Sequence, residues 1–182
     1  MNKSELIRAF VAVKMPEEIS EELENFLAEV RPLANIKWVK YGQFHITLKF
    51  LGELEPHVIS SVKKSLTPLK YFEPFNINLS YIGAFPNLHS PRVIWLSGNE
   101  GAQELTKLSR KVNEILYNDE EIPKDEKKFK AHLTLARLKS GFLSEELVRK
   151  LGTVQNFSWR CSELFLMRSE LTTKGPIYTE LL

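Results

Sequence analysis

The chain has few cysteines, no long apolar run and little net charge. These shortages bear on disulfides and metal sites, on membrane spans and on nucleic-acid binding. Its 182 residues include one cysteine, Cys161, which rules out an internal disulfide and a zinc site built from cysteines. A single thiol also favours a reducing compartment. No stretch approaches the roughly 20 apolar residues of a membrane span, and the apolar run near the N-terminus meets charge too early for a signal peptide. We therefore expect a cytoplasmic protein without a membrane partner.

Charges of the two signs are nearly balanced. The chain has 25 Lys and Arg against 23 Asp and Glu, so its formal net charge is only +2. This balance neither requires nor excludes nucleic acid, and any contact with RNA must come from basic residues placed locally. A composition of 43% hydrophobic and 26% charged residues is ordinary for a soluble protein that buries a core.

The order of the expected elements is the same in both halves of the chain. Apolar periodicity and turn signals in the first half predict, in order, a strand at 6–13, a helix at 16–30, a strand at 44–51, a helix at 55–66 and a strand at 75–85. The second half predicts a strand at 92–96, a helix at 101–117, a strand at 129–138, a helix capped by Ser144, and strands at 157–168 and 177–182. An internal duplication of about 85 residues explains this order most simply.

The duplication predicts an α+β fold with two pseudo-symmetric lobes. We expect a single bilobal domain over residues 1–182, with repeats at roughly 1–86 and 87–182. Each lobe should contain a mainly antiparallel sheet with helices on its outer side. A pseudo-two-fold axis would relate the lobes, and a cleft for an active site would lie between them.

One short motif occurs once in each repeat. The segments His45-Ile46-Thr47-Leu48 and His132-Leu133-Thr134-Leu135 lie at matching positions, each in an expected strand. Because side chains alternate along a strand, each histidine shares a face with its threonine, and the apolar residues face the core. Burying four polar groups without partners is costly, so we expect all four to line the cleft between the lobes.

Two histidines and two threonines around one cleft suit the cleavage of a phosphodiester without a metal. Because the ordinary imidazole pKa is near 6.5, one ring can be neutral and remove a proton while the other is charged and donates one. Threonine hydroxyls can donate hydrogen bonds to the non-bridging oxygens of a phosphate. Since the two motifs are equivalent, the residues alone leave open which histidine is the acid and which is the base.

Three alternatives compete with a catalytic pair of histidines. A single motif of this kind is most often a structural histidine, but its recurrence at matching positions favours a function. A shared zinc ion would need a third ligand, and we expect the remaining histidines, His57 in a helix start and His89 in a loop, to be exposed. A module that binds RNA ends without turnover also stays open, although titrating histidines argue against it. Its support is a set of basic residues around both motifs: Lys37, Lys40, Lys49, Lys127, Lys128, Lys130, Arg137 and Lys139.

Longer stretches of the chain resemble the 2H phosphoesterase superfamily, and within it most closely the RNA 2′,3′-cyclic phosphodiesterases, also called 2′-5′ RNA ligases. The stretches that carry the resemblance span nearly the whole chain: RAFVAVKMPEE, WVKYGQFHITLKFLGE, IGAFPNLHSPRVIWL, FKAHLTLARL and SELTTKGPIYTEL. One departure is Ala131, which stands where the family usually has a proline before the second histidine.

The resemblance implies an enzyme that opens a terminal 2′,3′-cyclic phosphate on RNA to a 2′-phosphate, with no metal and no cofactor. Ligation through a 2′-5′ bond would be the reverse reaction, and 2′-5′ oligonucleotides or small cyclic phosphates are alternative substrates. The partner would be RNA with a cyclic phosphate end, for instance a tRNA fragment, and we expect a monomer. The implied roles are those of general acid for His45, base for His132, phosphate contacts for Thr47, Thr134 and Arg137, and a base contact for Phe50.

Two of these residues conflict with simple strand geometry. Strict alternation places Phe50 on the face opposite His45, and Arg137 on the face opposite His132. Their implied roles therefore require a bulge or a strand end in each of the two strands. We also expect the charged segment 118–128 to be a solvated turn.

Overall fold

The computed structural model describes residues 5–139, 142–173 and 175–182. Its helices are α1 (Glu17–Val30), α2 (Pro56–Leu66), α3 (Ala102–Glu120) and α4 (Glu145–Leu151), with short 3-10 turns at Arg31–Leu33 and Thr67–Leu69. Its strands are β1 (Ile7–Lys14), β2 (Lys37–Trp38), β3 (His45–Leu54), β4 (Tyr71–Leu79), β5 (Tyr81–Phe85), β6 (Val93–Ser97), β7 (Leu133–Arg137), β8 (Phe157–Glu163), β9 (Phe165–Thr172) and β10 (Gly175–Glu180).

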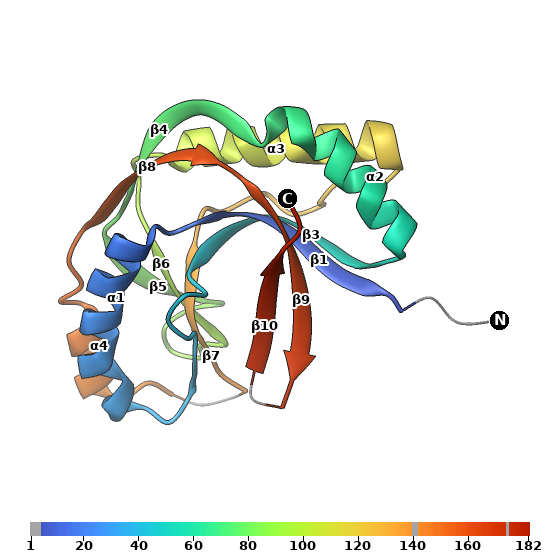
Figure 1. Ribbon diagram of the computed structural model, residues 1–182. Helices are drawn as coiled ribbons and strands as arrows, with labels where there is room; N and C mark the ends of the chain where they lie inside the picture. The colour runs from blue at the N-terminus through green and yellow to red at the C-terminus, as the bar shows by residue number, and fades with distance from the viewer. Residues whose placement is uncertain (1–4, 140–141, 174) are drawn as a thin grey trace.

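A single antiparallel sheet runs through the molecule in the order β10-β9-β1-β3-β7-β6-β5, with β2 added to β7 (Figure 1). Strands β4 and β8 form a separate two-stranded sheet. The α+β class and the antiparallel pairing expected from the sequence are confirmed. No helix in the described parts of the chain is long and apolar enough to cross a membrane.

The helices lie on the outside of the sheets in two pairs, α2 with α3 and α1 with α4 (Figure 1). Each helix turns an apolar stripe inward because its apolar residues recur every three or four positions. Helix α1 buries Leu23, Leu27 and Val30 in this way, and α2 buries Ile59, Val62 and Leu66. Helix α4 begins at the expected Ser144, whose Oγ accepts a hydrogen bond from the Leu147 N–H.

The main contacts between elements come in equivalent pairs. Strand β1 lies between β3 and β9, and β6 lies between β7 and β5. Helix α2 of the first half packs on α3 of the second, while α1 packs on α4. The last strand of each half is exchanged, since β5 pairs with β6 and β9 pairs with β1. This pattern supports the internal repeat, and it means that each side of the sheet contains strands of both halves.

Two expected strands are each divided in two. Residues 75–85 contribute to β4 and β5, and residues 157–168 contribute to β8 and β9, with breaks at Ser80 and Leu164. The first part of each pairs in the small sheet and the second part in the large one. The prediction of one continuous strand is wrong in both places. Apolar and aromatic residues stand on both sides of each break, so composition carries no signal of it.

Candidate active site

The two histidine motifs meet at one residue pair in the middle of the sheet. Strands β3 and β7 are joined where Ile46 pairs with Leu133, and both side chains are buried in the core. In an antiparallel pair this register places His45 across from Thr134, and Thr47 across from His132. All four side chains point to the face opposite Ile46 and Leu133. The structure thus brings the four polar side chains together, as the alternation predicts.

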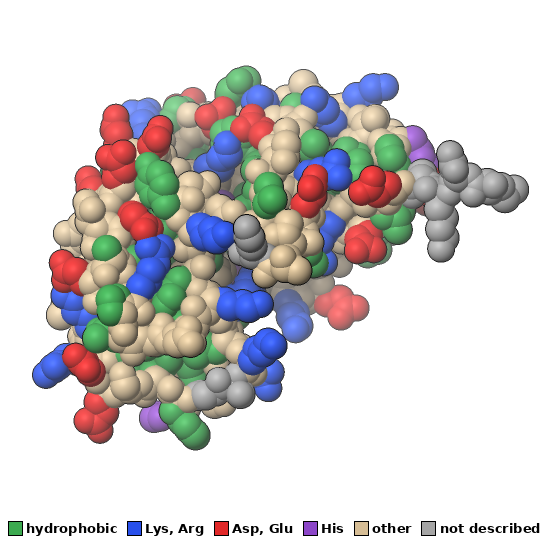
Figure 2. Space-filling view, turned by 60° about the horizontal axis from the view of Figure 1, so that its bottom comes forward, with side chains coloured by type: hydrophobic (Ala, Val, Ile, Leu, Met, Phe, Trp, Pro, Cys, Tyr) green, Lys and Arg blue, Asp and Glu red, His purple; other side chains and the backbone are tan. Residues whose placement is uncertain are grey.

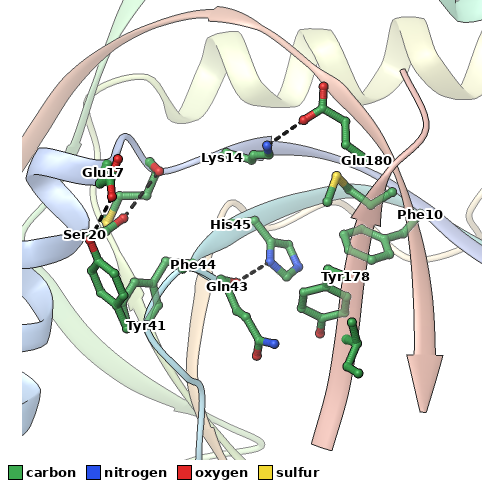
Figure 3. Close-up of a pocket in the computed structure, with 14 residues that line it drawn as sticks. Phe10, Lys14, Glu17, Ser20, Tyr41, Gln43, Phe44, His45, Tyr178 and Glu180 are labelled. Atoms are coloured by element: carbon green, nitrogen blue, oxygen red, sulfur yellow. Dashed lines mark hydrogen bonds and ion pairs between the residues drawn. The ribbon is translucent and has the colours of Figure 1, made fainter. Parts of the chain in front are cut away.

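Each imidazole is held by the same hydrogen bond. Nδ1 of His45 lies 2.7 Å from the carbonyl oxygen of Gln43, and Nδ1 of His132 lies 2.7 Å from that of Lys130. Because a carbonyl oxygen only accepts, Nδ1 is the protonated nitrogen in both rings. Figure 3 shows this bond for His45. The bond leaves Nε2 of each ring to take up or release a proton.

Aromatic rings pack against both imidazoles. The His45 ring centroid lies 4.9 Å from that of Phe10 and 5.2 Å from that of Tyr178, which meets it edge-on at 87° (Figure 3). The His132 ring meets Phe85 in the same way, at 5.1 Å and 84°. These contacts fix the ring planes and remove water from one side of each histidine.

The pKa of each histidine is lowered, and burial is the main cause in both. The carbonyls of Gln43 and Lys130 act in the opposite direction, since they accept a hydrogen bond from the ring. The positive charge of Arg137 lowers both pKa values further, and a charge on His132 also lowers the pKa of His45. Without a bound anion, both rings are therefore mostly neutral near neutral pH.

A bulge at equivalent positions of β3 and β7 changes the direction of the side chains that follow. On β3, Val11 pairs with Lys49 and Ala12 pairs with Thr47, so that Leu48 is the extra residue. On β7, Ile94 pairs with Ala136 and Trp95 pairs with Thr134, so that Leu135 is the extra residue. The carbonyl oxygen of Leu48 accepts a hydrogen bond from Ser109 Oγ (2.8 Å), and that of Leu135 accepts one from the Val39 N–H (2.8 Å).

The bulges bring Phe50 and Arg137 to the histidine face, because one extra residue reverses the alternation beyond it. The side chain of Phe50 is 60% exposed, and its ring lies 6.2 Å from Phe10, which itself contacts His45. The charge of Arg137 acts on both imidazoles, as its effect on their pKa values shows. The irregularity that the resemblance requires is thus present in both strands.

The same bulge turns Lys49 into the core. Only 2% of Lys49 is exposed, although alternation alone would place it beside His45 and Thr47. Its Nζ donates hydrogen bonds to Asn113 Oδ1 (2.7 Å), the Pro123 carbonyl (2.7 Å) and Asp125 Oδ1 (3.3 Å). Lys49 is therefore no phosphate ligand, contrary to its grouping with the basic residues around the motif. Lys49 thereby anchors the segment that follows α3. The solvated turn expected at 118–128 is exposed for the most part, but residues 118–120 belong to α3 and Ile122 is buried.

Two residues near the site were not expected from the sequence. Burial raises the pKa of the Tyr178 hydroxyl, although the charges of Arg137 and Arg8 act in the opposite direction. The charges of both arginines therefore act at Tyr178, which lies on β10, a strand without a counterpart in the first half. Figure 3 shows the Tyr178 ring beside His45. The only sequence signal was the stretch SELTTKGPIYTEL, which contains the tyrosine.

The remaining histidines lie where the sequence predicts. His57, at the start of α2, is exposed and lies 3.2 Å from a carboxylate oxygen of Glu55, and His89 is exposed in a loop. Within residues 5–139, 142–173 and 175–182, no three His, Cys, Asp or Glu side chains gather as a metal site would require. Figure 2 shows Lys and Arg side chains around a hollow on one face, so basic groups are concentrated locally despite the small net charge.

Known proteins match the chain along nearly its whole length. The family described as LigT like phosphoesterase matches in two consecutive stretches, residues 13–95 and 97–178. The chain belongs to the LigT-like phosphoesterase family. LigT-like relatives named RNA 2′,3′-cyclic phosphodiesterase occur in Aquifex aeolicus, with 36% identity over 96% of this chain and 94% of the relative, and in Archaeoglobus fulgidus, with 36% identity over 96% and 98%.

The LigT-like fold is also seen in solved structures. A crystal structure of a Thermus thermophilus protein is 33% identical in sequence and superimposes with a TM-score of 0.78, covering 96% of this chain and 95% of that one. Each of the two family matches contains one histidine motif. The 2H phosphoesterase resemblance inferred from the motifs is therefore confirmed.

Proposed function

We propose that this protein hydrolyses the 2′,3′-cyclic phosphate at the end of an RNA to a 2′-phosphate, without a metal and without a nucleotide cofactor. The observation that carries the proposal is the position of two histidines and two threonines on one face around the pair of Ile46 and Leu133. The names of the relatives from Aquifex aeolicus and Archaeoglobus fulgidus support RNA as the substrate. Fragments of tRNA would be suitable partners, and a monomer would suffice because one chain contributes both histidines.

In the proposed reaction the phosphorus atom lies between the two imidazoles. Neutral His132 takes a proton from water, whose oxygen attacks phosphorus, and the bond between phosphorus and the 3′-oxygen breaks. Protonated His45 gives its proton to that departing oxygen, so the phosphate stays on the 2′-oxygen. The hydroxyls of Thr47 and Thr134 donate hydrogen bonds to the non-bridging oxygens, where negative charge builds up.

Arg137 and Phe50 would hold the two ends of the terminal nucleotide. The guanidinium of Arg137 acts on both imidazoles, so it lies where it could neutralise a phosphate between them. The exposed ring of Phe50, supported by Phe10, offers a surface on which a base can stack.

The decisive experiment uses an oligonucleotide with a 2′,3′-cyclic phosphate end and protein dialysed against EDTA. We expect full turnover and a product with a 2′-phosphate and a free 3′-hydroxyl, identified by its resistance to an enzyme that removes only 3′-phosphates. A 3′-phosphate product would contradict the assigned direction of ring opening. Loss of turnover in EDTA, restored by a divalent metal, would exclude the acid–base pair.

The pH dependence should reflect the lowered histidine pKa values. Because burial and Arg137 disfavour the charged rings, both limbs of the kcat/KM profile should be set by pKa values below about 6.5. A bound phosphate anion favours the charged rings and raises both pKa values. The profile of kcat should therefore peak at a higher pH than that of kcat/KM. A rate that rises steadily through pH 9 would contradict catalysis by two imidazoles.

Replacing Arg137 with alanine should change both activity and the histidine titrations. Loss of a charged hydrogen bond to phosphate should lower kcat/KM by about 10- to 100-fold. Because the positive charge is removed, the pKa values of His45 and His132 should rise, which NMR titration of the ring protons measures directly. Arg160→Ala in β8 is the matched control and should leave both titrations unchanged. Unchanged imidazole pKa values in the Arg137 variant would show that its charge does not act at the site.

A further inference from the structure

The two imidazoles of the site differ in the strands that surround them. At one end the large sheet continues past β9 into β10, whereas at the other end it stops at β5 in the part of the chain that the structure describes. Figure 3 shows β10 passing beside His45, and the Tyr178 ring of this strand meets the imidazole edge-on. Among the described strands, this additional neighbour is present at His45 and not at His132.

A turn before β3 presents Gln43 to both the histidine and β10. The Gln43 N–H donates to the Lys40 carbonyl oxygen (3.1 Å), and Gly42 has a φ of 77°, a left-handed conformation that favours glycine. The carbonyl oxygen of Gln43 accepts the bond from His45 Nδ1, while its side-chain Nε2 donates to the Pro176 carbonyl oxygen of β10 (2.8 Å). One residue therefore orients the imidazole and attaches β10 beside it.

A second contact attaches the other end of β10 near the same histidine. Glu180 accepts a hydrogen bond from Lys14 Nζ (2.8 Å) and forms an ion pair with it. Lys14 is the residue that pairs with His45 between β1 and β3, and its ammonium also lies 4.1 Å from the centre of the Phe165 ring. The two contacts lie on either side of Tyr178 in the sequence of β10, so they hold its ring in place.

Tyr178 packs into a small apolar cluster that is separate from the main core. Its ring lies 5.2 Å from that of Phe10 at an angle of 75°, and Phe10 also contacts His45. The cluster contains only four buried residues: Phe10, Ala12, Phe165 and Met167. Because so small a cluster buries little apolar surface, the position of Tyr178 depends on the polar contacts at the two ends of β10.

Neither of these polar contacts is repeated at His132. Lys130 stands at the position of Gln43 and holds the imidazole through its carbonyl oxygen, but its ammonium lies 5.8 Å from the centre of an aromatic ring of β5. Ser97 corresponds to Lys14, since each stands two positions after the residue that pairs with a motif threonine. A serine hydroxyl cannot form the ion pair that Lys14 forms. The asymmetry of the two sites is thus present in side chains as well as in strands.

The proposed reaction makes different demands on the two rings. The oxygen that receives a proton from His45 belongs to the ribose, so the bound nucleotide fixes its position, whereas the water that meets His132 can adjust. Proton transfer to a fixed oxygen requires a fixed donor. We infer that β10 is a clamp for His45, in which Gln43 and Tyr178 are positioning residues that hold the ring toward the 3′-oxygen and keep water from its side. This inference rests on the proposed function and adds two residues that contact no reacting atom.

Release of the clamp should change the titration of His45 alone. A pocket of about 540 Å³ lies beside His45, and its lining includes Gln43 and Tyr178 (Figure 3). If β10 moves away, water from this pocket reaches the ring. Because burial is the main cause that lowers the pKa of His45, added water should raise that pKa. The charged groups near the ring or in the pocket are kept in the variants described below: Arg137, His132, Lys14, Glu17 and Glu180.

The first test is Gln43→Met, which keeps the length of the side chain and the carbonyl that holds His45 but removes the donor to β10. We expect kcat for an RNA with a 2′,3′-cyclic phosphate end to fall roughly tenfold while KM changes by less than about twofold, since the ring is displaced and the substrate contacts are kept. NMR titration should show a raised pKa for His45 and an unchanged one for His132. Gln103→Met, at an exposed position of α3, is the matched control and should change none of these values.

The second test separates the ring of Tyr178 from its hydroxyl. Tyr178→Leu removes the ring and should produce the same two changes as Gln43→Met. Tyr178→Phe keeps the ring and should restore most of the lost kcat. Because both residues act through one clamp, combining Gln43→Met with Tyr178→Leu should cost little more than Tyr178→Leu alone.

Three results would overturn the inference. The pKa of His45 stays unchanged in Gln43→Met and Tyr178→Leu, the pKa values of both histidines move together, or Tyr178→Phe loses as much activity as Tyr178→Leu. The last result would show that the hydroxyl matters and not the ring. The titrations use the protein without substrate, so they decide on the clamp even if the wild-type protein opens no cyclic phosphate and the proposed function fails.

Discussion

Replacing either His45 or His132 with alanine should lower turnover of a 2′,3′-cyclic phosphate by about 10² or more. Each ring moves one proton in the same transition state, so the loss of either leaves the other without its partner. The double variant should therefore lose much less than the product of the two single losses. Thr47→Val and Thr134→Val should cost less than either histidine change, since each removes one hydrogen bond to the phosphate.

The chain supplies its own controls for the histidine variants. His57→Ala and His89→Ala remove exposed imidazoles outside the site and should leave turnover unchanged. Circular dichroism and thermal unfolding should show that all four variants remain folded. A near-normal rate for either His45→Ala or His132→Ala, measured in EDTA, would show that the acid–base pair is wrong.

Replacing Lys49 with methionine should destabilise the protein by roughly 2–4 kcal/mol. Methionine can fill most of the space of the lysine chain, but it cannot donate hydrogen bonds. The carbonyl of Pro123 would lose its donor, Asn113 Oδ1 would keep only the bond from the Asp125 N–H (3.0 Å), and the Asp125 carboxylate would lose its cation. Because only 2% of Lys49 is exposed, water cannot readily replace it. Equilibrium unfolding in urea measures the difference.

An exposed lysine of α3 provides the comparison for Lys49. Lys111→Met makes the same chemical change on the surface and should alter the free energy of unfolding by no more than about 0.5 kcal/mol. A stability of the Lys49 variant equal to that of the Lys111 variant would show that the buried contacts contribute nothing net. Below its unfolding transition, the Lys49 variant should keep most of its turnover, since the ammonium lies on the face away from the histidines.

The sequence by itself predicted an internal repeat, and it determined the antiparallel α+β class and the faces of the two motifs. Period-two alternation is local, so His45 and Thr47 share a face whatever lies around them, and His132 and Thr134 do the same. The helices were predictable because their apolar residues recur at helical spacing, which is also a local pattern, and the resulting stripe must be buried. Exposure of His57 and His89 was equally predictable, since neither lies in an apolar segment.

Only the tertiary structure decided where Phe50, Lys49 and Arg137 point. The Leu48 carbonyl at the bulge of β3 accepts a hydrogen bond from Ser109 in α3, and the Leu135 carbonyl accepts one from Val39, which continues the pairing of β2 with β7. Both partners come from segments distant in the sequence. A local sequence pattern cannot predict a hydrogen-bond partner that lies far away in the sequence. One hint was available, since the position equivalent to Lys49 is Ala136, a residue expected in a core.

Contacts between distant segments also decide the exchange of β5 and β9 between the two halves and the residues that surround the site. Whether an apolar strand joins the large sheet or the small one depends on which edges are free after the other strands have paired. The breaks at Ser80 and Leu164 therefore have no signature in composition. Likewise, Tyr178 reaches His45 only because β10 pairs with β9 and β9 with β1. Local periodicity sets which face a side chain occupies, while contacts between distant segments set its neighbours.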